Sequence, residues 1–284
     1  MSPLPVTTAS AISDVDTDFR PAVYLAFGSF QNAFNRIWHR YTLRGAARIP
    51  SRPVLFVGNH SGVGVADILC MLGGWRARFG LRRRVVGMMH ELFVAMPIVG
   101  FIARSFGAVY ASPDAARQAF ARGYDVACFP GGDLDACRSF TEPREVHFGD
   151  RRGYVRVALA TGVPIVPLAT IGSHWSYLVL PGGDRVASIA RAFGARSKRF
   201  PITVGSLLVV LTCGLAIGGV LSPWWILAAL LAAIVPTPVR ITSEILEPID
   251  VCAATAHLDG DERVEAAHRL VHGTLARAVK TMAH

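Results

Sequence analysis

The chain has 284 residues, of which 52% are hydrophobic, with a mean hydropathy of +0.39 and a formal net charge of +9. This length suffices for one full hydrophobic core, and the hydropathy, which is high for a soluble enzyme, points to a membrane. Nearly all the positive charge is arginine, because Lys198 and Lys280 are the only lysines. The arginines are scattered, without the basic tail or motif of a nucleic-acid-binding protein, so we exclude nucleic acid and expect anionic lipid head groups or CoA phosphates as partners, with coding bias as the alternative explanation of the arginine excess.

Residues 1–18 are predicted to form a disordered lead-in. They are small and polar, and they include Asp14, Asp16 and Asp18. They lack both the basic segment and the apolar core of a secretory signal, so we expect the folded part of the chain to stay on the cytoplasmic side.

Residues 19–40 are predicted to form an amphipathic helix at a membrane interface. Apolar side chains recur there at spacings of three and four residues, as on one face of a helix. These side chains are Phe19, Val23, Phe27, Phe30, Phe34, Ile37 and Trp38. The alternative is that this aromatic face packs on the rest of the domain.

From residue 41 to residue 284 the pattern is that of an α/β domain. The alternation at 41–45 and the apolar run Val54–Val57 predict two strands. Further strands are predicted at 84–88, 108–110, 125–129, 164–169 and 239–246, and helices at 114–122 and 153–161. The alternation of strands and helices predicts a mixed, largely parallel central sheet flanked by helices.

Residues 202–235 interrupt this domain with a hydrophobic insert. These 34 positions contain no charged residue, which predicts a membrane segment. One straight helix of that length would measure roughly 50 Å, well beyond the roughly 30 Å hydrocarbon core of a bilayer. We therefore expect a break at Pro223 and a hairpin with arms at 205–221 and 224–235, which lets residues 239–246 rejoin the sheet. A pair of buried core helices is the alternative.

Asn59, His60 and Asp67 form the first candidate site, in a glycine-containing loop directly after the strand at 54–57. The pKa of histidine lies near neutrality, so an imidazole can remove the proton of a hydroxyl that attacks a thioester. A carboxylate on the other ring nitrogen would fix the tautomer and stabilise the imidazolium. His60 and Asp67 are therefore the candidate acid–base pair, and a purely structural histidine is the alternative.

Two further segments carry candidate binding residues. Phe129, Pro130, Gly131, Gly132 and Asp133 follow an apolar strand and precede Arg138, and paired glycines let backbone amides approach an oxyanion or a phosphate. Arg104 lies within an apolar stretch, where an arginine needs an anionic partner such as a substrate phosphate. The alternatives are a plain turn at the glycines and a structural salt bridge at Arg104.

Taken in chain order, these segments resemble the glycerolipid acyltransferase superfamily of the lysophosphatidic acid acyltransferase type, and more closely its monoacylglycerol/diacylglycerol acyltransferase-like branch. The following blocks carry the resemblance: Asn59–His60 with Asp67 for Asn-His with Asp, Gly100–Arg104 for Gly-x-x-x-Arg, Phe129–Gly132 for Phe-Pro-Glu-Gly, and Val163–Pro167 for Val-Pro-x-x-Pro. The similarity covers residues 41–250 apart from the apolar insert.

Two positions depart from the pattern of that family. Six residues separate His60 from Asp67, where the family has four. Gly131 stands in place of the glutamate of the third block, a form of the neutral-lipid branch, and Asp133 or Asp135 is the candidate for the role of that carboxylate.

The resemblance implies direct transfer of a fatty acyl group from acyl-CoA or acyl carrier protein to a hydroxyl of a lysophospholipid or other glycerolipid. His60 would be the general base and Asp67 its orienting carboxylate, with the amides of Gly131 and Gly132 near the oxyanion or phosphate, and Arg104 and Arg138 as anion contacts. The sequence contains no Gly-x-Ser-x-Gly nucleophile elbow, in agreement with direct transfer.

We expect no metal and no cofactor, since the acyl donor is a co-substrate. The expected location is the cytoplasmic face of a membrane, with the insert either spanning the bilayer or dipping into it. Three rivals stay open: a diacylglycerol or other neutral-lipid acyltransferase, a thioesterase or lipase, and a catalytically silent lipid-binding membrane protein.

Overall fold

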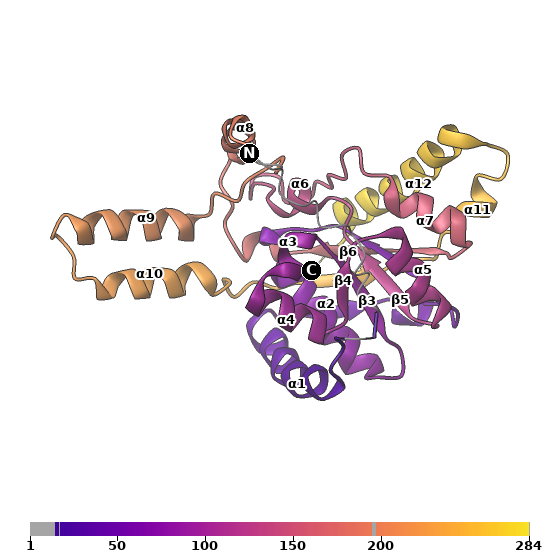
Figure 1. Cartoon of the computed structure of the whole chain (residues 1–284), viewed down its shortest axis with the longest axis horizontal. Helices are drawn as coiled ribbons and strands as arrows, with labels where there is room; N and C mark the ends of the chain where they lie inside the picture. The colour runs from indigo at the N-terminus through magenta and orange to yellow at the C-terminus, as the bar shows by residue number, and fades with distance from the viewer. Residues whose placement is uncertain (1–14, 17, 195–196, 284) are drawn as a thin grey trace, which may run out of the picture.

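The computed structural model describes residues 15–16, 18–194 and 197–283, and its centre is a seven-stranded sheet in the order β1-β7-β6-β2-β5-β3-β4 (Figure 1). The strands are β1 (Thr42–Arg44), β2 (Leu55–Gly58), β3 (Val85–Met89), β4 (Ala108–Tyr110), β5 (Asp125–Cys128), β6 (Ile165–Ile171) and β7 (Thr242–Ile245). All neighbouring strands run parallel except β6 and β7, which are antiparallel. The predicted mixed, largely parallel sheet is confirmed.

Helices alternate with strands along most of the chain, as is expected for an α/β domain. They are α1 (Pro21–Trp38), α2 (Ala66–Phe79), α3 (Glu91–Ala95), α4 (Pro97–Ser105), α5 (Pro113–Ala121), α6 (Gly132–Ala136), α7 (Gly153–Thr161), α8 (Gly183–Ala192), α9 (Val204–Ile217), α10 (Trp224–Ile234), α11 (Val251–Ala254) and α12 (Gly260–Thr281). Three single turns of 3₁₀-helix are η1 (Ala46–Arg48), η2 (Gly62–Gly64) and η3 (Ser173–Trp175).

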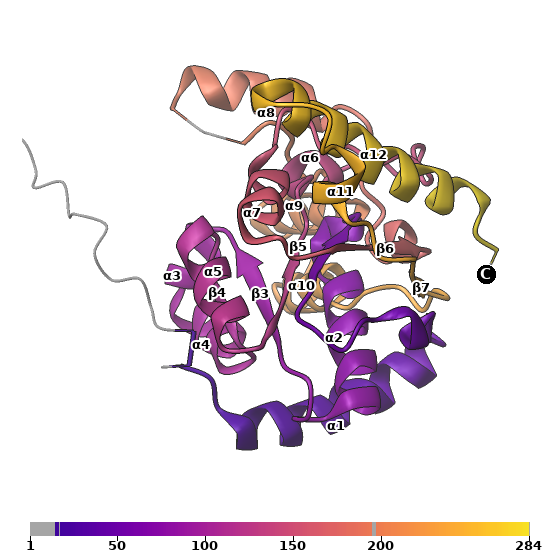
Figure 2. The ribbon, with the colours of Figure 1, turned by 90° about the vertical axis from the view of Figure 1, so that its right-hand side faces the viewer.

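The central strand β2 is buried on both faces, which explains why its sequence is a continuous apolar run instead of an alternating one. Leu55 and Val57 lie in a core that β2 shares with α5, α7 and α12. Val54 and Phe56 pack on the other face, where the ring of Phe56 meets Trp75 of α2 edge to face. Helices therefore cover both faces of the sheet, and α1 lies outside α2 (Figures 1 and 2).

The N-terminal helix α1 packs on α2 through small and polar residues. Gln31 and Asn35 are buried, and both side-chain amides donate hydrogen bonds to the carbonyl of Leu69 in α2. The aromatic stripe faces outward, because Phe30 is 68% and Ile37 is 79% exposed. The helix does pack on the domain, but it buries Tyr24, Gly28, Gln31 and Asn35, which lie beside the aromatic stripe considered from the sequence.

The apolar insert forms two helices, α9 and α10, that project from the body as a hairpin (Figure 1). Thr212 and Ala229 are their only buried residues, so this helix pair is not part of the core. The root of the hairpin is tied to the body: Trp38 Nε1 donates to the carbonyl of Pro236, and the hydroxyl of Tyr177 donates to the carbonyl of Ile234. Over the described residues, each helix is too short or too polar to pass through a bilayer.

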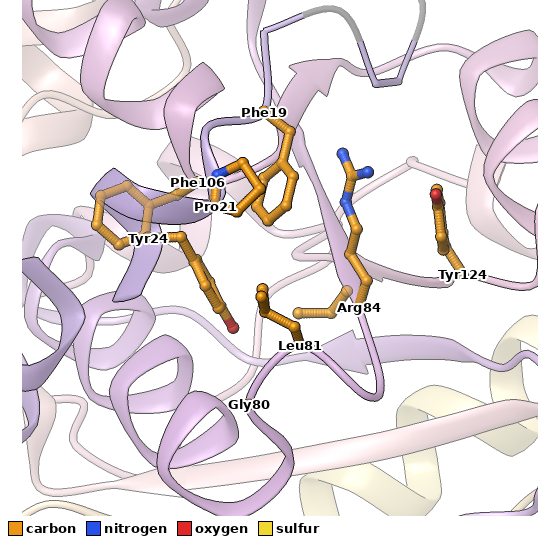
Figure 3. Close-up of a pocket in the computed structure, with 9 residues that line it drawn as sticks. Phe19, Pro21, Tyr24, Gly80, Leu81, Arg84, Phe106 and Tyr124 are labelled. Carbon is orange, nitrogen blue, oxygen red and sulfur yellow. The ribbon is translucent and has the colours of Figure 1, made fainter. Parts of the chain in front are cut away.

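Most of the predicted lead-in, residues 1–14 and 17, lies outside the described residues. Val15 is buried against the core, and Asp16 pairs with Arg84. A cavity of about 210 Å³ lies beside this arginine, whose guanidinium carbon is 4.0 Å from the ring centroid of Phe19 and 4.6 Å from that of Tyr124 (Figure 3). Arg84 precedes β3, so this cavity lies at the amino ends of the parallel strands.

Candidate functional site

Loops from three adjacent parallel strands meet at the opposite edge of the sheet. The loop with His60 follows β2, the loop with Phe129 follows β5, and η3 follows β6. The carboxyl edge of a parallel sheet is where α/β folds bind ligands, because the loops that follow neighbouring strands converge there.

The structure brings Asp67 to His60 despite the six intervening residues. His60 Nδ1 lies 2.9 Å from Asp67 Oδ2, which also accepts a hydrogen bond from the backbone amide of Ser61 at 2.9 Å. The extra residues form η2, where Gly62, Val63 and Gly64 all have positive φ. Val63 is notable because a β-branched residue rarely adopts this conformation. This left-handed turn places Asp67 in the first turn of α2, where the helix dipole favours a carboxylate.

The contact with Asp67 makes Nδ1 the protonated nitrogen and leaves the lone pair of Nε2 as the basic position. The ring of Phe129 stacks on the imidazole with 4.8 Å between centroids. Backbone also approaches the ring closely, since a Cβ atom placed on Gly64 would lie 2.3 Å from Nε2. The side chain of His60 keeps 12% of its surface exposed.

The electrostatic surroundings of His60 favour the protonated ring. Burial acts to lower the pKa of His60, but the charge and hydrogen bond of Asp67 and the charge of Asp135 outweigh it, so that the net pKa is raised. The nearby Arg138 guanidinium opposes this rise. A general base with a raised pKa accepts a proton more readily once it is neutral.

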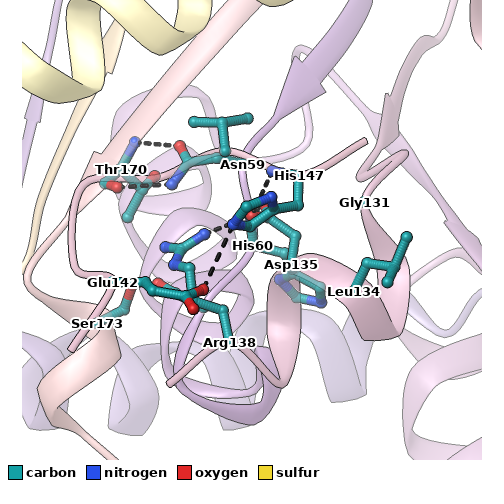
Figure 4. Close-up of polar contacts among 12 residues, drawn as sticks. Asn59, His60, Gly131, Leu134, Asp135, Arg138, Glu142, His147, Thr170 and Ser173 are labelled. Atoms are coloured by element: carbon teal, nitrogen blue, oxygen red, sulfur yellow. Dashed lines mark hydrogen bonds and ion pairs between the residues drawn. The ribbon is translucent and has the colours of Figure 1, made fainter. Parts of the chain in front are cut away.

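A buried ion pair lies beneath the loop, on the backbone side of His60 (Figure 4). Asp135 is fully buried and pairs with Arg138, which is also buried. Asp135 Oδ2 accepts a hydrogen bond from the backbone amide of His60 at 2.6 Å, and Asp135 Oδ1 accepts one from the amide of His147 at 3.0 Å. Two consecutive amides, those of His60 and Ser61, are thus bound by two different carboxylates.

Several predicted binding residues have structural partners. The side chain of Asn59 joins β2 to β6, because it donates to the carbonyl of Thr170 and accepts from the amide of the same residue (Figure 4). The amide of Gly132 donates to the carbonyl of Phe129 in a turn. Arg151 holds this turn by donating to the carbonyls of Pro130 and Gly131.

The side chains of Asp133 and Arg104 form ion pairs with other side chains of the protein. The carboxylate of Asp133 pairs with Arg151 and accepts hydrogen bonds from the backbone amide of Lys198 and the hydroxyl of Ser197. Arg104 Nε lies 3.1 Å from Asp18 Oδ2, and the same guanidinium donates to the carbonyl of Val94. Their roles in binding substrate stay predictions.

Contacts from distant parts of the chain complete the site and were missed from the sequence. The hydroxyl of Ser173 contacts that of Ser61, and His147 contributes only its backbone amide to Asp135. Every residue type except proline has a backbone N–H group, so the residue type at position 147 could not have predicted its hydrogen bond to Asp135.

Comparison with known proteins assigns residues 40–171 to the acyltransferase family. An uncharacterized protein of Mycobacterium leprae is 31% identical over 193 residues, which is 66% of this chain and 49% of the relative. A chicken (Gallus gallus) protein described as a "DGAT1/2-independent enzyme synthesizing storage lipids" is 31% identical over 136 residues, 48% of this chain and 40% of the relative. The chain thus spans about half the length, or less, of these curated relatives.

A solved structure shares the fold. The crystal structure of the 1-acyl-sn-glycerophosphate (LPA) acyltransferase PlsC from Thermotoga maritima matches with a TM-score of 0.50 at 15% sequence identity. The match covers 92% of this chain and 83% of the PlsC chain, so nearly the whole chain follows a known architecture.

Proposed function

Because the chain belongs to the glycerolipid acyltransferase superfamily, we propose that it transfers a fatty acyl group from acyl-CoA, or from acyl carrier protein, to a glycerolipid hydroxyl. The observation that carries this proposal is the hydrogen bond between His60 Nδ1 and Asp67 at the carboxyl edge of the sheet. It gives the chain an oriented base at the place where α/β folds bind ligands.

In the proposed reaction the lipid hydroxyl attacks the thioester carbonyl while its proton passes to His60 Nε2. Asp67 stabilises the resulting imidazolium through Nδ1. The tetrahedral intermediate then collapses, the carbon–sulfur bond breaks, and His60 returns the proton to the departing thiolate. The products are an ester and a free thiol, and no covalent acyl-enzyme, metal or cofactor takes part.

The acceptor is a lysophospholipid or another glycerolipid, and one observation favours a neutral acceptor such as diacylglycerol. Both predicted anion contacts already have carboxylate partners, Asp18 for Arg104 and Asp135 for Arg138. A lipid phosphate would have to displace one of these partners, whereas a neutral hydroxyl acceptor would not. The storage-lipid description of the chicken relative is consistent with this second candidate.

Membrane attachment through the hairpin and the outward face of α1 is part of the proposal. With 14 residues, α9 is about 21 Å long, more than half the roughly 30 Å hydrocarbon core but short of crossing it. The hairpin therefore suits insertion from one side, on the cytoplasmic face. It lies between β6 and β7 in the chain, and Ile171 at the end of β6 pairs with Thr242 at the start of β7, so its root lies at the same sheet edge as His60.

An acceptor screen tests the proposal. The full chain is incubated with acyl-CoA and vesicles that contain lysophosphatidate, lysophosphatidylcholine, monoacylglycerol and diacylglycerol, and the products are analysed by mass spectrometry. We expect thiol release coupled one-to-one to a new ester of at least one acceptor. Free fatty acid without acylated lipid would identify a thioesterase or lipase, and no thiol release with acyl-CoA or acyl carrier protein would favour the silent lipid-binding protein.

A further inference from the structure

The loop that carries His60 is held from below by a carboxylate that does not touch the imidazole ring. Asp135 lies in α6, 75 residues further along the chain, and its Oδ2 accepts the backbone amide of His60 at 2.6 Å. Because a hydrogen bond to a charged acceptor is stronger than a neutral one, this contact fixes the backbone from which the ring projects.

Both oxygens of the Asp135 carboxylate are engaged. Oδ1 accepts a hydrogen bond from the amide of His147 and pairs with Arg138, so these hydrogen-bonding neighbours of the carboxylate are all donors. Asp135 is fully buried and Arg138 nearly so. A buried charge without partners is costly, and removal of one member of such a pair leaves the other charge uncompensated.

The space occupied by Asp135 explains the glycine at position 131. A Cβ atom on Gly131 would lie 2.3 Å from Cβ of Asp135 and 2.6 Å from the carbonyl oxygen of His147. The φ of Gly131 is −59°, which any residue adopts, so conformation does not require glycine there. The Asp135 side chain and the backbone carbonyl of His147 together exclude a larger residue, because they fill the place where a side chain at position 131 would begin.

We propose that Asp135 is the positioning residue for His60, and that it supplies, one helical turn later, the carboxylate that the third sequence block lacks at Gly131. Asp67 holds the base by its ring, and Asp135 holds it by its backbone. Of the two aspartates that the sequence offered for this role, the geometry selects Asp135, because Asp133 is turned toward Arg151 and Lys198. The effect of Asp135 on turnover rests on the proposed acyl transfer.

The charges that face the imidazole give this role a measurable signature. Asp67 and Asp135 raise the pKa of His60, whereas Arg138 lowers it. Replacement of Asp135 by asparagine removes one raising charge and leaves the lowering charge of Arg138 unpaired. The pKa of His60 must then fall, and the acid limb of the rate profile, below which the base is protonated, must move to lower pH.

The test compares Asp135→Asn with Asp125→Asn in the full chain. Whichever way the asparagine amide is turned, its NH2 group faces a former donor, and the remaining oxygen is a neutral acceptor, so the anchor of the loop is weakened. Asp125 is a matched control, because it is equally buried and paired with Arg83, and it accepts a hydrogen bond from the amide of Val54 before β2, at the opposite end of that strand. Both substitutions are expected to lower thermal stability.

With acyl-CoA and acceptor vesicles, we expect Asp135→Asn to lower kcat by roughly tenfold to a hundredfold, with KM for acyl-CoA within about threefold and the acid limb at lower pH. Asp125→Asn keeps the acid limb of the wild type. A kcat for Asp135→Asn within about threefold of the wild type, or a reduced kcat with an unmoved acid limb, would overturn the proposal.

A measurement without turnover separates this inference from the proposed function. The ring pKa of His60 is followed by NMR in the wild type and both variants, and we expect a lower value in Asp135→Asn alone. If the wild type transfers no acyl group, the proposed function is wrong, but the NMR titration still tests whether Asp135 positions His60. If the pKa of His60 is the same in all three proteins, the positioning role is wrong even for an active acyltransferase.

Discussion

At the scale of single residues, the imidazole of His60 is surrounded by groups that leave it little freedom. Asp67 binds Nδ1, Phe129 stacks on one face, and the backbone of Gly64 approaches Nε2. Restricted freedom matters for a general base, because misplacement by about 1 Å can cost roughly a hundredfold in rate.

Gly64 gives the first prediction at this scale. Its φ is +75°, and a Cβ atom there would lie 2.3 Å from His60 Nε2, so Gly64→Ala must displace the ring. We expect kcat to fall by roughly a hundredfold, with a stability loss of about 1 kcal/mol from backbone strain. Steady-state kinetics and thermal unfolding check both numbers.

Gly162→Ala is the matched control, because Gly162 has φ +67° and open space around its Cβ position. It should show the same strain without the loss of rate. Equal kcat values for the two alanine variants would show that the close approach of Gly64 to His60 has no catalytic importance.

A second residue, His268 of α12, gives a prediction about acid stability. Burial and the nearby Arg152 lower the pKa of His268 to about 4, and its Nδ1 is paired with the hydroxyl of Tyr154. Below the unfolded pKa, the unfolded chain therefore binds more protons, and stability falls as the pH drops from about 7 toward 4. His268→Gln should remove about 1 kcal/mol of this loss between pH 7 and pH 5, measured by urea unfolding. An identical pH dependence in both proteins would contradict this assignment.

At the scale of elements, two segments expose apolar side chains where a soluble domain would bury them. The outward stripe of α1 carries Phe30 and Ile37, and the hairpin exposes residues such as Val210 along α9. Trp38 connects the two segments, because it ends α1 and donates to Pro236 at the root of α10. Exposed apolar surface of this extent is typical of interaction sites, and because the insert is uncharged, a bilayer is the partner that we propose for it.

Charges placed on the hairpin test this interpretation. Val210→Asp/Leu211→Asp should weaken sedimentation with vesicles by at least a hundredfold, since each aspartate costs about 2.5–3.5 kcal/mol inside a bilayer. Both residues are exposed, so thermal stability should stay within about 0.5 kcal/mol of the wild type.

Leu270→Asp, an exposed apolar position on α12, serves as the control and should bind vesicles like the wild type. Unaltered vesicle binding by the hairpin variant would remove the hairpin from the membrane-binding surface.

The sequence predicted most elements but not how they face one another. Strands such as Ala108–Tyr110 and the helix Gly153–Thr161 have the predicted bounds, because apolar runs and breaker residues are local signals. The orientation of α1 was not predictable, because it depends on hydrogen bonds from Gln31 and Asn35 to a carbonyl in α2. Burial of two side-chain amides beside Tyr24 and Gly28 is not expected from an apolar periodicity, and the hydrogen bonds to α2 explain it.

The candidate site, like the fold, could be predicted from the sequence only in part. Asn59, His60 and Phe129 could be identified from motif order, and His60 does meet Asp67 and Phe129. Sequence reasoning left Asp133 and Asp135 as equal candidates for the missing carboxylate, because both lie within one turn of Gly131. Only the fold shows that Asp135 reaches the His60 amide while Asp133 turns to Arg151.

At the level of the whole molecule, His60, the proposed base, and the root of the apolar hairpin lie at one edge of the sheet. The loops after β5, β2 and β6 form the site, and the hairpin follows β6 in the chain, with its root tied to the loop that contains Tyr177. In the proposed function, the acceptor hydroxyl would be held near the bilayer surface while the acyl donor approaches from water.

The catalytic role of His60 is tested by acyl transfer with His60→Ala beside the wild type and His257→Ala, a variant of an exposed histidine before α12. With acyl-CoA and acceptor vesicles, we expect His60→Ala to form ester at least a hundredfold more slowly than the wild type. Vesicle binding should remain that of the wild type, the variant should stay folded at the assay temperature, and His257→Ala should retain its full rate. Ester formation at the wild-type rate by folded His60→Ala would show that His60 is not the general base.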